Sequence, residues 1–438
     1  MKKKLFSILT VIVITANVCF SQTGSWYKGD LHSHSTYSDG ESPVSSVIAN
    51  AESKGFNFYV ITDHDNTYTP YVGNPITWSD TAYHSNNMIL LYGMEWTTDI
   101  GHAGIWNSTP FPYDSIFAAN TAKQPAKAAS IVKSQGGLFS INHPLNGALL
   151  WDVGYNFEFP SIEILNGPIS YLLSNNNSVI TTVWEPLLMS GKRITGVGGS
   201  DMHKLSYWLP SVYPNLGSPS TWVYSAEPNG EGIIDGIRNG HVCISNSPTD
   251  PRCEFFADIH GNNTFNYMMG DAIADTNSAV TFRVNLVGSG SNLSVKVIKN
   301  GIPLFSQPLA ISSSNPTIEF TDTPYQRAFY RIELLSGNSS ISWTNPIYCG
   351  YQTETIAAVA SNDIANQISI YPNPTQNLVN VQNNTHETIS INLINVCGQT
   401  LKTVTSSDEL ITIGMETLSK GIYFIKINNY KTFKIIKQ

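Results

Sequence analysis

The chain has 438 residues, too many for one ordinary hydrophobic core, so we expect two or three domains. It is 41% hydrophobic and 11% aromatic, which excludes wholesale disorder and leaves enough apolar side chains for real cores. The formal net charge is −8 at pH 7 and there is no long basic run, so the composition does not favour binding to a nucleic-acid backbone.

The first 21 residues are typical of a secretory signal peptide. Three lysines precede an apolar run, residues 5–16, which is too short to span a bilayer. We expect cleavage near Ser21 and no transmembrane helix in the mature chain. A lipoprotein signal ending at Cys19 is the alternative, although residues 16–18 form a poor lipobox.

The strand that follows ends in two histidines one residue apart, His32 and His34. On an extended strand, residues i and i+2 point to the same side, so these two imidazoles can share one metal ion. Neutral imidazole suits zinc, manganese or iron. Because an isolated pair of this kind is more often two surface histidines, the placement of the other histidines decides between the two interpretations.

From residue 26 to about residue 248, short apolar runs alternate with helical patterns, as expected for βα units. Ser42-Pro43 predicts the start of a helix with an apolar stripe from Val44 to Ala51. The other predicted helices cover residues 124–134, 179–189 and 233–238. The predicted strands that follow the first one cover residues 56–62, 89–94, 102–106, 138–142, 162–165, 193–198 and 221–224.

Most candidate ligands fall at or just after the ends of these predicted strands. In a βα barrel, the carboxyl ends of the strands form the rim on which active sites are built. Surface histidines would rarely show this regular placement, so the pattern favours a metal site. The candidate ligands are His32, His34, Asp39, His64, Glu95, His102, His143, Asp201 and His203.

These side chains are more ligands than one ion can use, so we expect two or three adjacent divalent ions bridged by a carboxylate. Such a cluster binds the oxygens of a phosphate and lowers the pKa of a bridging water toward neutral, which makes hydroxide the nucleophile. The sequence contains no Gly-rich phosphate loop, Gly-X-Ser-X-Gly motif or cysteine nucleophile pattern that competes with this interpretation.

The motifs Asp-Leu-His-Ser-His-Ser, Thr-Asp-His-Asp, Gly-Met-Glu, Gly-His-Ala, Asn-His-Pro and Gly-Ser-Asp-Met-His follow one another between residues 28 and 248. In these motifs the chain resembles the polymerase and histidinol phosphatase (PHP) superfamily, and in particular its exported metal-dependent phosphoesterases. The resemblance implies a distorted (β/α)₇ barrel with a trinuclear metal site.

The same resemblance implies how the ligands divide among the ions. The first ion would be held by His32, His34, Glu95 and Asp201. The second would be held by Glu95, His102 and His143, with Glu95 bridging. The third would be held by Asp39, His64 and His203. Many relatives have a histidine where Asp39 stands, and aspartate is also a competent oxygen ligand.

His203 and Asp63 are the candidate catalytic residues. His203 is placed to help protonate the leaving alkoxide, directly or through water. Asp63 could orient His64 as a hydrogen-bond acceptor, or it could simply form the turn after its strand. Lys204 and Arg193 are candidates for binding a substrate phosphate, although lone cations near strand ends are commonly solvated.

Residues 251–352 change to short alternating strands with Gly-containing turns, which predicts a β-sandwich accessory domain. Residues 328–333, followed by residues 344–347, resemble the sandwich appended to some exported PHP proteins. In an exported chain, Cys243 and Cys253 could form a disulfide or stay as buried thiols.

The tail, residues 367–438, again shows short strands after a polar, Ala-rich linker, residues 353–366. Its motifs Ile-Tyr-Pro-Asn-Pro (370–374), Val-Cys-Gly-Gln (396–399) and Leu-Ser-Lys-Gly-Ile-Tyr (418–423) resemble a type A sorting domain for type IX secretion. The resemblance implies passage across the outer membrane, followed by removal of the tail or anchoring at the surface. An adhesive or carbohydrate-binding module is the alternative.

The sequence therefore predicts an α/β protein with a signal peptide (1–21), a metallohydrolase barrel (22–250) and two small all-β sandwich domains (251–352 and 367–438). We expect a secreted or surface phosphoesterase with two or three ions of Mn, Fe or Zn. Its partners would be a small phosphorylated substrate and the type IX secretion machinery. A metal-dependent amidohydrolase or carbamate hydrolase on the same barrel, or a non-catalytic surface binding protein, remains open.

Overall fold

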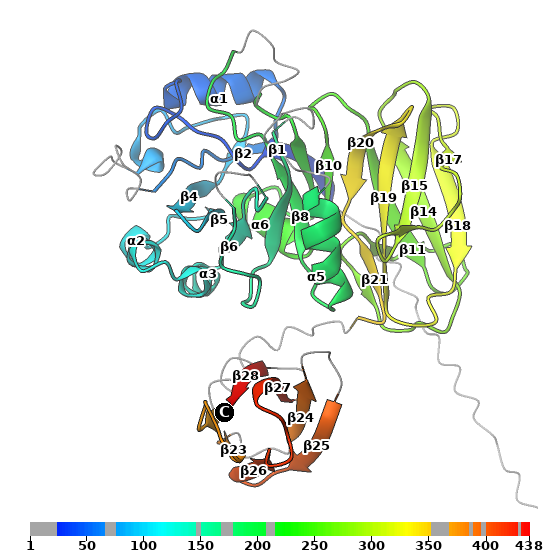
Figure 1. The fold of residues 1–438 in the computed structure, drawn as a ribbon. Helices are drawn as coiled ribbons and strands as arrows, with labels where there is room; N and C mark the ends of the chain where they lie inside the picture. Colours follow the sequence, from blue (N-terminus) through cyan, green and yellow to red (C-terminus); the bar gives the residue numbers. More distant parts are fainter. Residues whose placement is uncertain are drawn as a thin grey trace, which may run out of the picture. The chain divides into compact units, whose positions relative to one another are not determined.

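The computed structural model describes residues 24–65, 76–145, 150–167, 178–206, 215–351, 368–384, 389–395, 400–427 and 431–438 (Figure 1). The predicted signal peptide, the linker and Cys397 lie outside the described residues. The chain forms two compact units, Met1–Thr353 and Glu354–Gln438, which we describe separately.

Two groups of strands in the first unit carry the predicted ligands. A five-stranded sheet has the order β4-β5-β6-β7-β8. Its strands are β4 (Tyr92–Thr98), β5 (Gly101–Asn107), β6 (Leu138–Ile141), β7 (Ser161–Asn166) and β8 (Thr195–Gly199). One arm of a 12-stranded sheet has the order β10-β9-β1-β2-β3. These strands are β1 (Ser25–Asp30), β2 (Phe58–Tyr59), β3 (Ile89–Leu90), β9 (Ser220–Ser225) and β10 (Val242–Ser245).

Backbone hydrogen bonds join these two groups of strands at both ends. After β2, His64 forms an isolated parallel bridge with Glu95 of β4. After β1, Ser33 forms a parallel bridge with Met202, which follows β8. The segments that carry the predicted ligands are thereby hydrogen-bonded to one another across large distances in sequence.

Helices pack beside these strands (Figure 1). The described helices are α1 (Val44–Ser53), α2 (Tyr113–Thr121), α3 (Pro125–Ser134), α5 (Glu185–Met189), α6 (Gly230–Arg238), a π-helical segment (Val179–Trp184) and a 3₁₀ turn (Thr77–Ser79). The helices predicted from 44, 124, 179 and 233 are confirmed, although the third begins as a π-helix. Helix α2 was not predicted, because its apolar residues form only a weak stripe.

The 12-stranded sheet continues from β10 through β20 into the β-rich second half of the first unit. It packs there against the four-stranded sheet β12-β11-β14-β18 (Figure 1). The strands of this half are β11 (Arg252–Asp258), β12 (Tyr267–Met268), β13 (Ala272–Ile273), β14 (Val280–Val287), β15 (Leu293–Lys299), β16 (Ile302–Pro303), β17 (Leu309–Ala310), β18 (Thr317–Asp322), β19 (Ala328–Ser336), β20 (Ser339–Thr344) and β21 (Ile347–Cys349).

The shared core of these two sheets includes Phe255, Phe282 and Ile332. Cys243 and Cys253 are buried in this core as free thiols, so the structure shows buried thiols rather than the disulfide that the sequence also allowed. The domain boundary that we predict at residue 250 falls within the first compact unit, between β10 and β11.

The second unit contains a three-stranded sheet, β22-β23-β26, and a four-stranded sheet, β25-β24-β27-β28. Their strands are β22 (Ile368–Tyr371), β23 (Leu378–Asn383), β24 (Ile389–Asn395), β25 (Thr400–Ser406), β26 (Leu410–Gly414), β27 (Gly421–Ile427) and β28 (Lys431–Lys437). Buried side chains of both sheets, such as Val379 and Ile425, form its core.

The described part of the chain is thus a mixed α/β protein in which strands predominate and the later sheets are sandwich-like. Among its helices, none has the length and apolar character that crossing a membrane requires.

Candidate metal centre

Seven segments bring the predicted ligands to one place. His32 and His34 follow β1, His64 follows β2, and His143 follows β6. Glu95 lies within β4 and His102 within β5. Asp201 and His203 follow β8, and Asp39 lies on the loop before α1. Sequence reasoning placed these residues at strand ends, and the structure adds that Glu95 and His102 lie on neighbouring strands of one antiparallel pair.

The first group of ligand atoms consists of Nε2 of His32, Nε2 of His34 and Oδ1 of Asp201. The two nitrogens lie 3.3 Å apart, and the carboxylate oxygen lies 3.3 Å from His32 and 3.2 Å from His34. Ligands that share a tetrahedral ion at about 2.0–2.1 Å lie about 3.3 Å from one another. The spacing of this group therefore fits a small divalent ion.

Glu95 lies at the centre of the cluster, and its side chain is only 1% exposed. Its Oε1 atom lies 3.2 Å from Nε2 of His32, 3.3 Å from Nδ1 of His102 and 3.2 Å from Nε2 of His143. Its Oε2 atom lies 2.9 Å from Nδ1 of His64. A carboxylate whose two oxygens face different sets of histidines has the arrangement that a bridging ligand needs.

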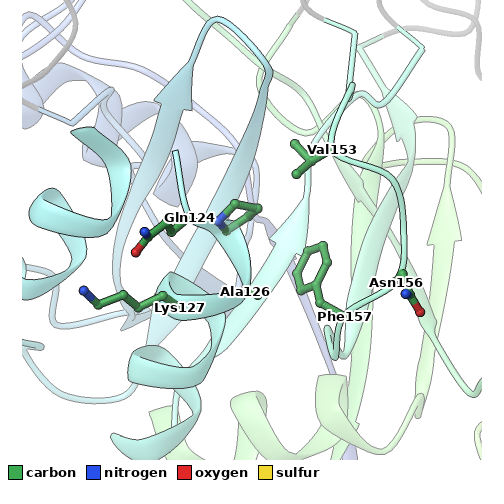
Figure 2. A pocket seen from close by; sticks show the side chains of 7 residues that line it. Gln124, Ala126, Lys127, Val153, Asn156 and Phe157 are labelled. Atoms are coloured by element: carbon green, nitrogen blue, oxygen red, sulfur yellow. The ribbon is translucent and has the colours of Figure 1, made fainter. Parts of the chain in front are cut away.

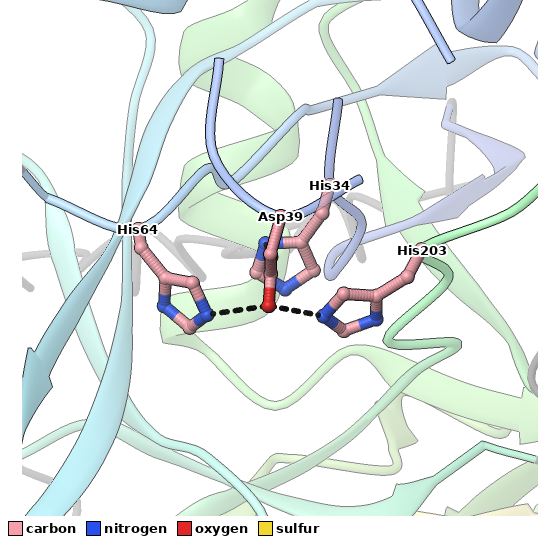
Figure 3. A group of neighbouring side chains, drawn as sticks. All are labelled: His34, Asp39, His64 and His203. Carbon is pink, nitrogen blue, oxygen red and sulfur yellow. Dashed lines mark ion pairs between the residues drawn. The ribbon is translucent and has the colours of Figure 1, made fainter. Parts of the chain in front are cut away.

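The group at the open side of the cluster combines His34, Asp39, His64 and His203 (Figure 3). Oδ2 of Asp39 lies 3.5 Å from Nε2 of His64 and 3.2 Å from Nε2 of His203, and these are the contacts dashed in Figure 3. The side chains of Asp39 and His203 are 29% and 31% exposed, whereas the other members are nearly buried. Solvent or a substrate therefore reaches the cluster from this side.

The observed groups divide the ligands differently from the predicted ones. His64 faces two groups, because Nδ1 points to Glu95 while Nε2 points to Asp39. His102 forms a group with His64 and Glu95, and His143 forms one with His32 and Glu95, so the predicted set of Glu95, His102 and His143 is split. The structure also adds His34 to the predicted third set.

The electrostatics of the cluster favour ionised carboxylates. Burial alone would raise the pKa values of Glu95 and Asp201, but the surrounding histidines hold both well below their usual range. Burial and the neighbouring His203 lower the pKa of His34 to about 4. Against the effect of burial, Glu95 and Asp39 raise the pKa of His64 to about 10.

The residues present fit divalent ions. The buried Nδ1 of His102 lies 3.3 Å from Oε1 of Glu95 but forms no hydrogen bond within the described part of the chain, a costly state that an ion bound to both atoms would relieve. Imidazole nitrogens and carboxylate oxygens together suit zinc, manganese or iron.

Asp63, a predicted catalytic residue, belongs to none of the groups that could hold an ion among the described residues. Its carboxylate accepts hydrogen bonds from the backbone N–H of Ser35 at 2.7 Å and from the hydroxyls of Ser35, Ser38 and Thr77 at 2.6–2.7 Å. These contacts fix the loop that carries Asp39. A catalytic role for Asp63 stays a prediction.

The two predicted phosphate-binding cations lie in different places. Lys204 forms an ion pair with Glu41 at 2.9 Å, and its side chain is 41% exposed. Arg193 donates a hydrogen bond to the carbonyl oxygen of Gly270 at 2.7 Å and lies over the ring of Tyr348. Arg193 therefore faces the β-rich half of the unit, and its substrate role stays a prediction.

Three polar residues outside the predicted ligand set also contact the ligands; of these, the sequence suggested only Glu163, as an aid to the rim. The side-chain amide of Asn142 donates to Oε1 of Glu95 at 2.9 Å. Glu163 and Asn166 of β7 contact His32, His143 and Asp201. The sequence signals are weak: Asn142 lies in the Asn-His-Pro motif, Glu163 lies within a predicted strand, and Asn166 follows that strand.

A pocket of about 410 Å³ lies at the start of α3 and is lined partly by Pro125, Lys127, Val153 and Phe157 (Figure 2). None of the predicted ligands lines it. Its walls are mainly apolar, and they bring together no set of metal-binding or nucleophilic side chains.

Comparisons with known proteins identify two parts of the chain. The PHP domain model matches residues 30–128, and the model of the secretion system C-terminal sorting domain matches residues 369–438. No curated protein matches the chain. The chain thus carries a PHP domain and, at its end, a type IX secretion sorting domain, which directs proteins to the cell surface or the medium.

Two solved structures are similar to parts of the chain. One is a two-domain protein from Bacteroides vulgatus that contains a predicted PHP-like metal-dependent phosphoesterase. It is 16% identical, with a TM-score of 0.38, and the match covers 74% of this chain and 96% of that one. The other is a candidate metal-dependent phosphoesterase from Bifidobacterium adolescentis. It is 14% identical, with a TM-score of 0.30 and coverage of 43% and 90%. Because both TM-scores are low, the assignment of the two domains does not depend on these structures.

Proposed function

We propose that this chain, which combines a PHP domain with a type IX secretion sorting domain, is an exported phosphoesterase that hydrolyses phosphate mono- or diesters. The observation that carries the proposal is the packing of six histidines and two further carboxylates around Glu95, with ligand atoms in groups that fit small divalent ions. A barrel closed by the backbone bridges of His64 and Ser33 would hold these residues, as a distorted (β/α)₇ barrel does.

We propose that two or three ions of manganese, iron or zinc occupy the cluster. When bound, such ions neutralise phosphate oxygens and lower the pKa of coordinated water, so that hydroxide is available near neutral pH. His32, His34 and Asp201 would hold one ion, and Glu95 would link it to the groups that His143 and His102 each form with Glu95. His34, Asp39, His64 and His203 would hold the ion at the open side.

The protein's own groups would act on the substrate at this open side. The Nδ1–H of His203 donates to the carbonyl oxygen of Asp201 at 2.8 Å, which leaves Nε2 facing Asp39. Because a His203 that holds an ion through Nε2 keeps its one proton on Nδ1, bound to the carbonyl oxygen of Asp201, the proton for a leaving alkoxide would come through water beside this exposed histidine. Among the cations of the described residues, we propose that Lys204, the next residue, binds the substrate phosphate.

The test combines metal analysis with a phosphoesterase screen on the purified chain. We expect two or three equivalents of manganese, iron or zinc, together with release of phosphate or nitrophenol from mono- or diester substrates. The same metal content with turnover of amides or carbamates, and none of phosphoesters, would replace the phosphoesterase by an amidohydrolase. A metal-free chain that stays inactive after metal addition would leave only a binding protein.

For export, we propose that residues 1–21 are a signal peptide and that the type IX machinery then recognises the tail. The match of residues 369–438 to the sorting-domain model supports this route. Removal of the tail or anchoring at the surface would follow export.

A further inference from the structure

We propose that Glu163 is a positioning residue whose two carboxylate oxygens hold the metal ligands His32 and His143 in place, while Asn166 ties Glu163 to a third ligand, Asp201. The inference rests on the proposed metal site. It adds a buried carboxylate that is itself in none of the ligand groups of the described residues.

Each oxygen of Glu163 accepts a hydrogen bond from a different ligand residue. Oε1 lies 3.0 Å from Nδ1 of His32, and Oε2 accepts from the backbone N–H of His143 at 2.9 Å. The side-chain amide of Asn166 donates to Oε2 of Glu163 at 3.1 Å and to Oδ2 of Asp201 at 3.2 Å. Glu163 is 2% exposed and Asn166 is 4% exposed, so water competes little for these bonds.

An irregularity in β7 is what places both side chains on the same side. Three residues apart on a regular strand, Glu163 and Asn166 would point to opposite faces. The pairing of β7 with β8 shifts between Glu163 and Leu165, so one extra residue lies in β7 at this point. A bulge of this kind re-aims the side chains that follow it. Ile164 and Leu165 then both pack in the apolar core, and Asn166 returns to the face of Glu163.

The contact with His32 determines which ring nitrogen is available to a metal ion. When Nδ1–H donates to Glu163, Nε2 carries the lone pair, and Nε2 is the atom that lies beside Asp201 and Glu95. An acceptor at the far nitrogen fixes the tautomer and orientation of a ligand histidine and raises its basicity.

The backbone contact of Glu163 concerns His143, whose φ of 25° lies in the left-handed region that non-glycine residues rarely adopt. The N–H of this strained residue is fixed by Oε2 of Glu163. Nε2 of its imidazole can thereby lie 3.2 Å from Oε1 of Glu95.

Only a carboxylate can make all these contacts at once. Glutamine has nearly the same volume but offers one acceptor oxygen and one amide donor. If its oxygen faced His32, its NH₂ would face the N–H of His143, donor against donor. If the amide were flipped, its NH₂ would face Nδ1 of His32 and would force the proton onto Nε2, the ligand atom.

The experiment compares the whole chain with three variants, E163Q, N166A and E185Q, after removal of metal with a chelator. Each protein is then titrated with Co²⁺ and with Zn²⁺, with metal content measured by mass spectrometry and the visible absorption of Co²⁺ recorded. Folding is checked by circular dichroism of the metal-free proteins. The control E185Q replaces another buried glutamate of the same unit, which bonds to Arg331 rather than to the cluster.

For E163Q we expect a loss of about 10–100-fold in metal affinity and an altered Co²⁺ spectrum, the size typical of outer-shell partners. N166A should show a smaller loss in the same direction, and E185Q should bind metal like the wild type. A role in packing alone predicts instead that E163Q binds metal like the wild type, and that result would overturn the inference.

Two further outcomes of this experiment also have a definite meaning. If the wild-type chain itself binds neither metal, the proposed metal site fails rather than the role of Glu163. If E163Q does not fold, N166A decides the question, because unchanged affinity and an unchanged Co²⁺ spectrum in that variant would count against the positioning network.

Discussion

At the scale of single residues, the centre depends on Glu95, which contacts five histidines through two oxygens. Removing the charge of a carboxylate in this position leaves several imidazoles without their common partner. The surrounding ligands come from six further segments. Among the described residues, no other carboxylate reaches both His64 and His143. Glu95 is therefore the most informative residue to change.

We expect E95Q to lower the metal content of the purified protein and to reduce turnover by more than about 100-fold, beyond the loss typical of outer-shell partners. Metal analysis and phosphoester hydrolysis measure the two effects. A variant that keeps its full metal content and its activity would rule out the bridging role.

The close packing around Glu163 leads to a second prediction. A Cβ atom on Gly199 would overlap Oε1 of Glu163 and Cβ of His32. We expect G199A to destabilise the protein by about 1–3 kcal/mol, as overpacking does, and to lower its metal affinity. Thermal unfolding and Zn²⁺ titration measure these changes.

G230A is the matched control, since a Cβ there would meet only side-chain and backbone atoms of Ser108 and Leu91 at 3.2 Å or more. We expect little change in the control. Equal metal affinity in G199A and wild type would show that the close packing of Gly199, Glu163 and His32 does not matter for binding.

The sequence allowed all nine candidate ligands to be named, because each lies in a short motif next to a strand. The division into three sets that the resemblance implies differs from the groups in the structure, since the two faces of His64 depend on how β2 lies against β4. Arg193 illustrates the opposite limit. Its substrate role stays a prediction, and its place near a strand does not reveal that its side chain turns toward Gly270, more than 70 residues away in sequence.

At the scale of elements, hydrophobic periodicity was sufficient to predict a helix where that helix has a clear apolar face. Helix α1 buries Val44, Val47, Ile48 and Ala51, the stripe seen in the sequence. Helix α2 buries only Ile116, Ala119 and Asn120, which is too few for a pattern. The bulge in β7 was also not predictable, because nothing in residues 161–166 signals an extra residue.

A buried ion pair joins the helical and β-rich halves of the first unit. Arg331 of β19 bonds to Glu185 of α5 at 2.9 and 2.6 Å, and it also bonds to Glu333 at 2.8 Å. The Arg331 side chain is 2% exposed, so solvent screens these contacts little. The sheet that runs from β10 into β20 joins the same two halves.

We expect R331M to destabilise the first unit by about 3–5 kcal/mol, because it leaves the buried carboxylate of Glu185 without its partner. R283M on β14 breaks a more exposed pair with Glu319 and should cost less than about 1 kcal/mol. Chemical denaturation of both variants makes the comparison. Similar losses in the two variants would contradict the structural role of the buried pair.

At the scale of the whole molecule, the two compact units correspond to two tasks. Every candidate ligand lies in the first unit, and the sorting domain lies in the second. The sequence identified both from local motifs. It predicted a boundary at residue 250, but it could not show that β10 pairs with β20 across this point, because strand pairing between distant segments leaves no local signal.

We expect deletion of residues 368–438 to leave metal content and thermal stability of the remainder unchanged, while the protein accumulates in the periplasm. Metal content and stability should stay unchanged because the second unit has a separate core. Export should fail because this unit matches a sorting domain. Cell fractionation and metal analysis test them. Normal export of the shortened chain would refute the sorting role.

The proposed metal centre and its reaction are tested most directly by metal content measured beside phosphoester hydrolysis on the same preparation of the whole chain. We expect two or three bound divalent ions and a turnover that is lost with chelator and restored by manganese, iron or zinc. A chain that binds these ions yet hydrolyses no phosphoester would contradict the proposed reaction, and a chain that binds none would contradict the metal centre itself.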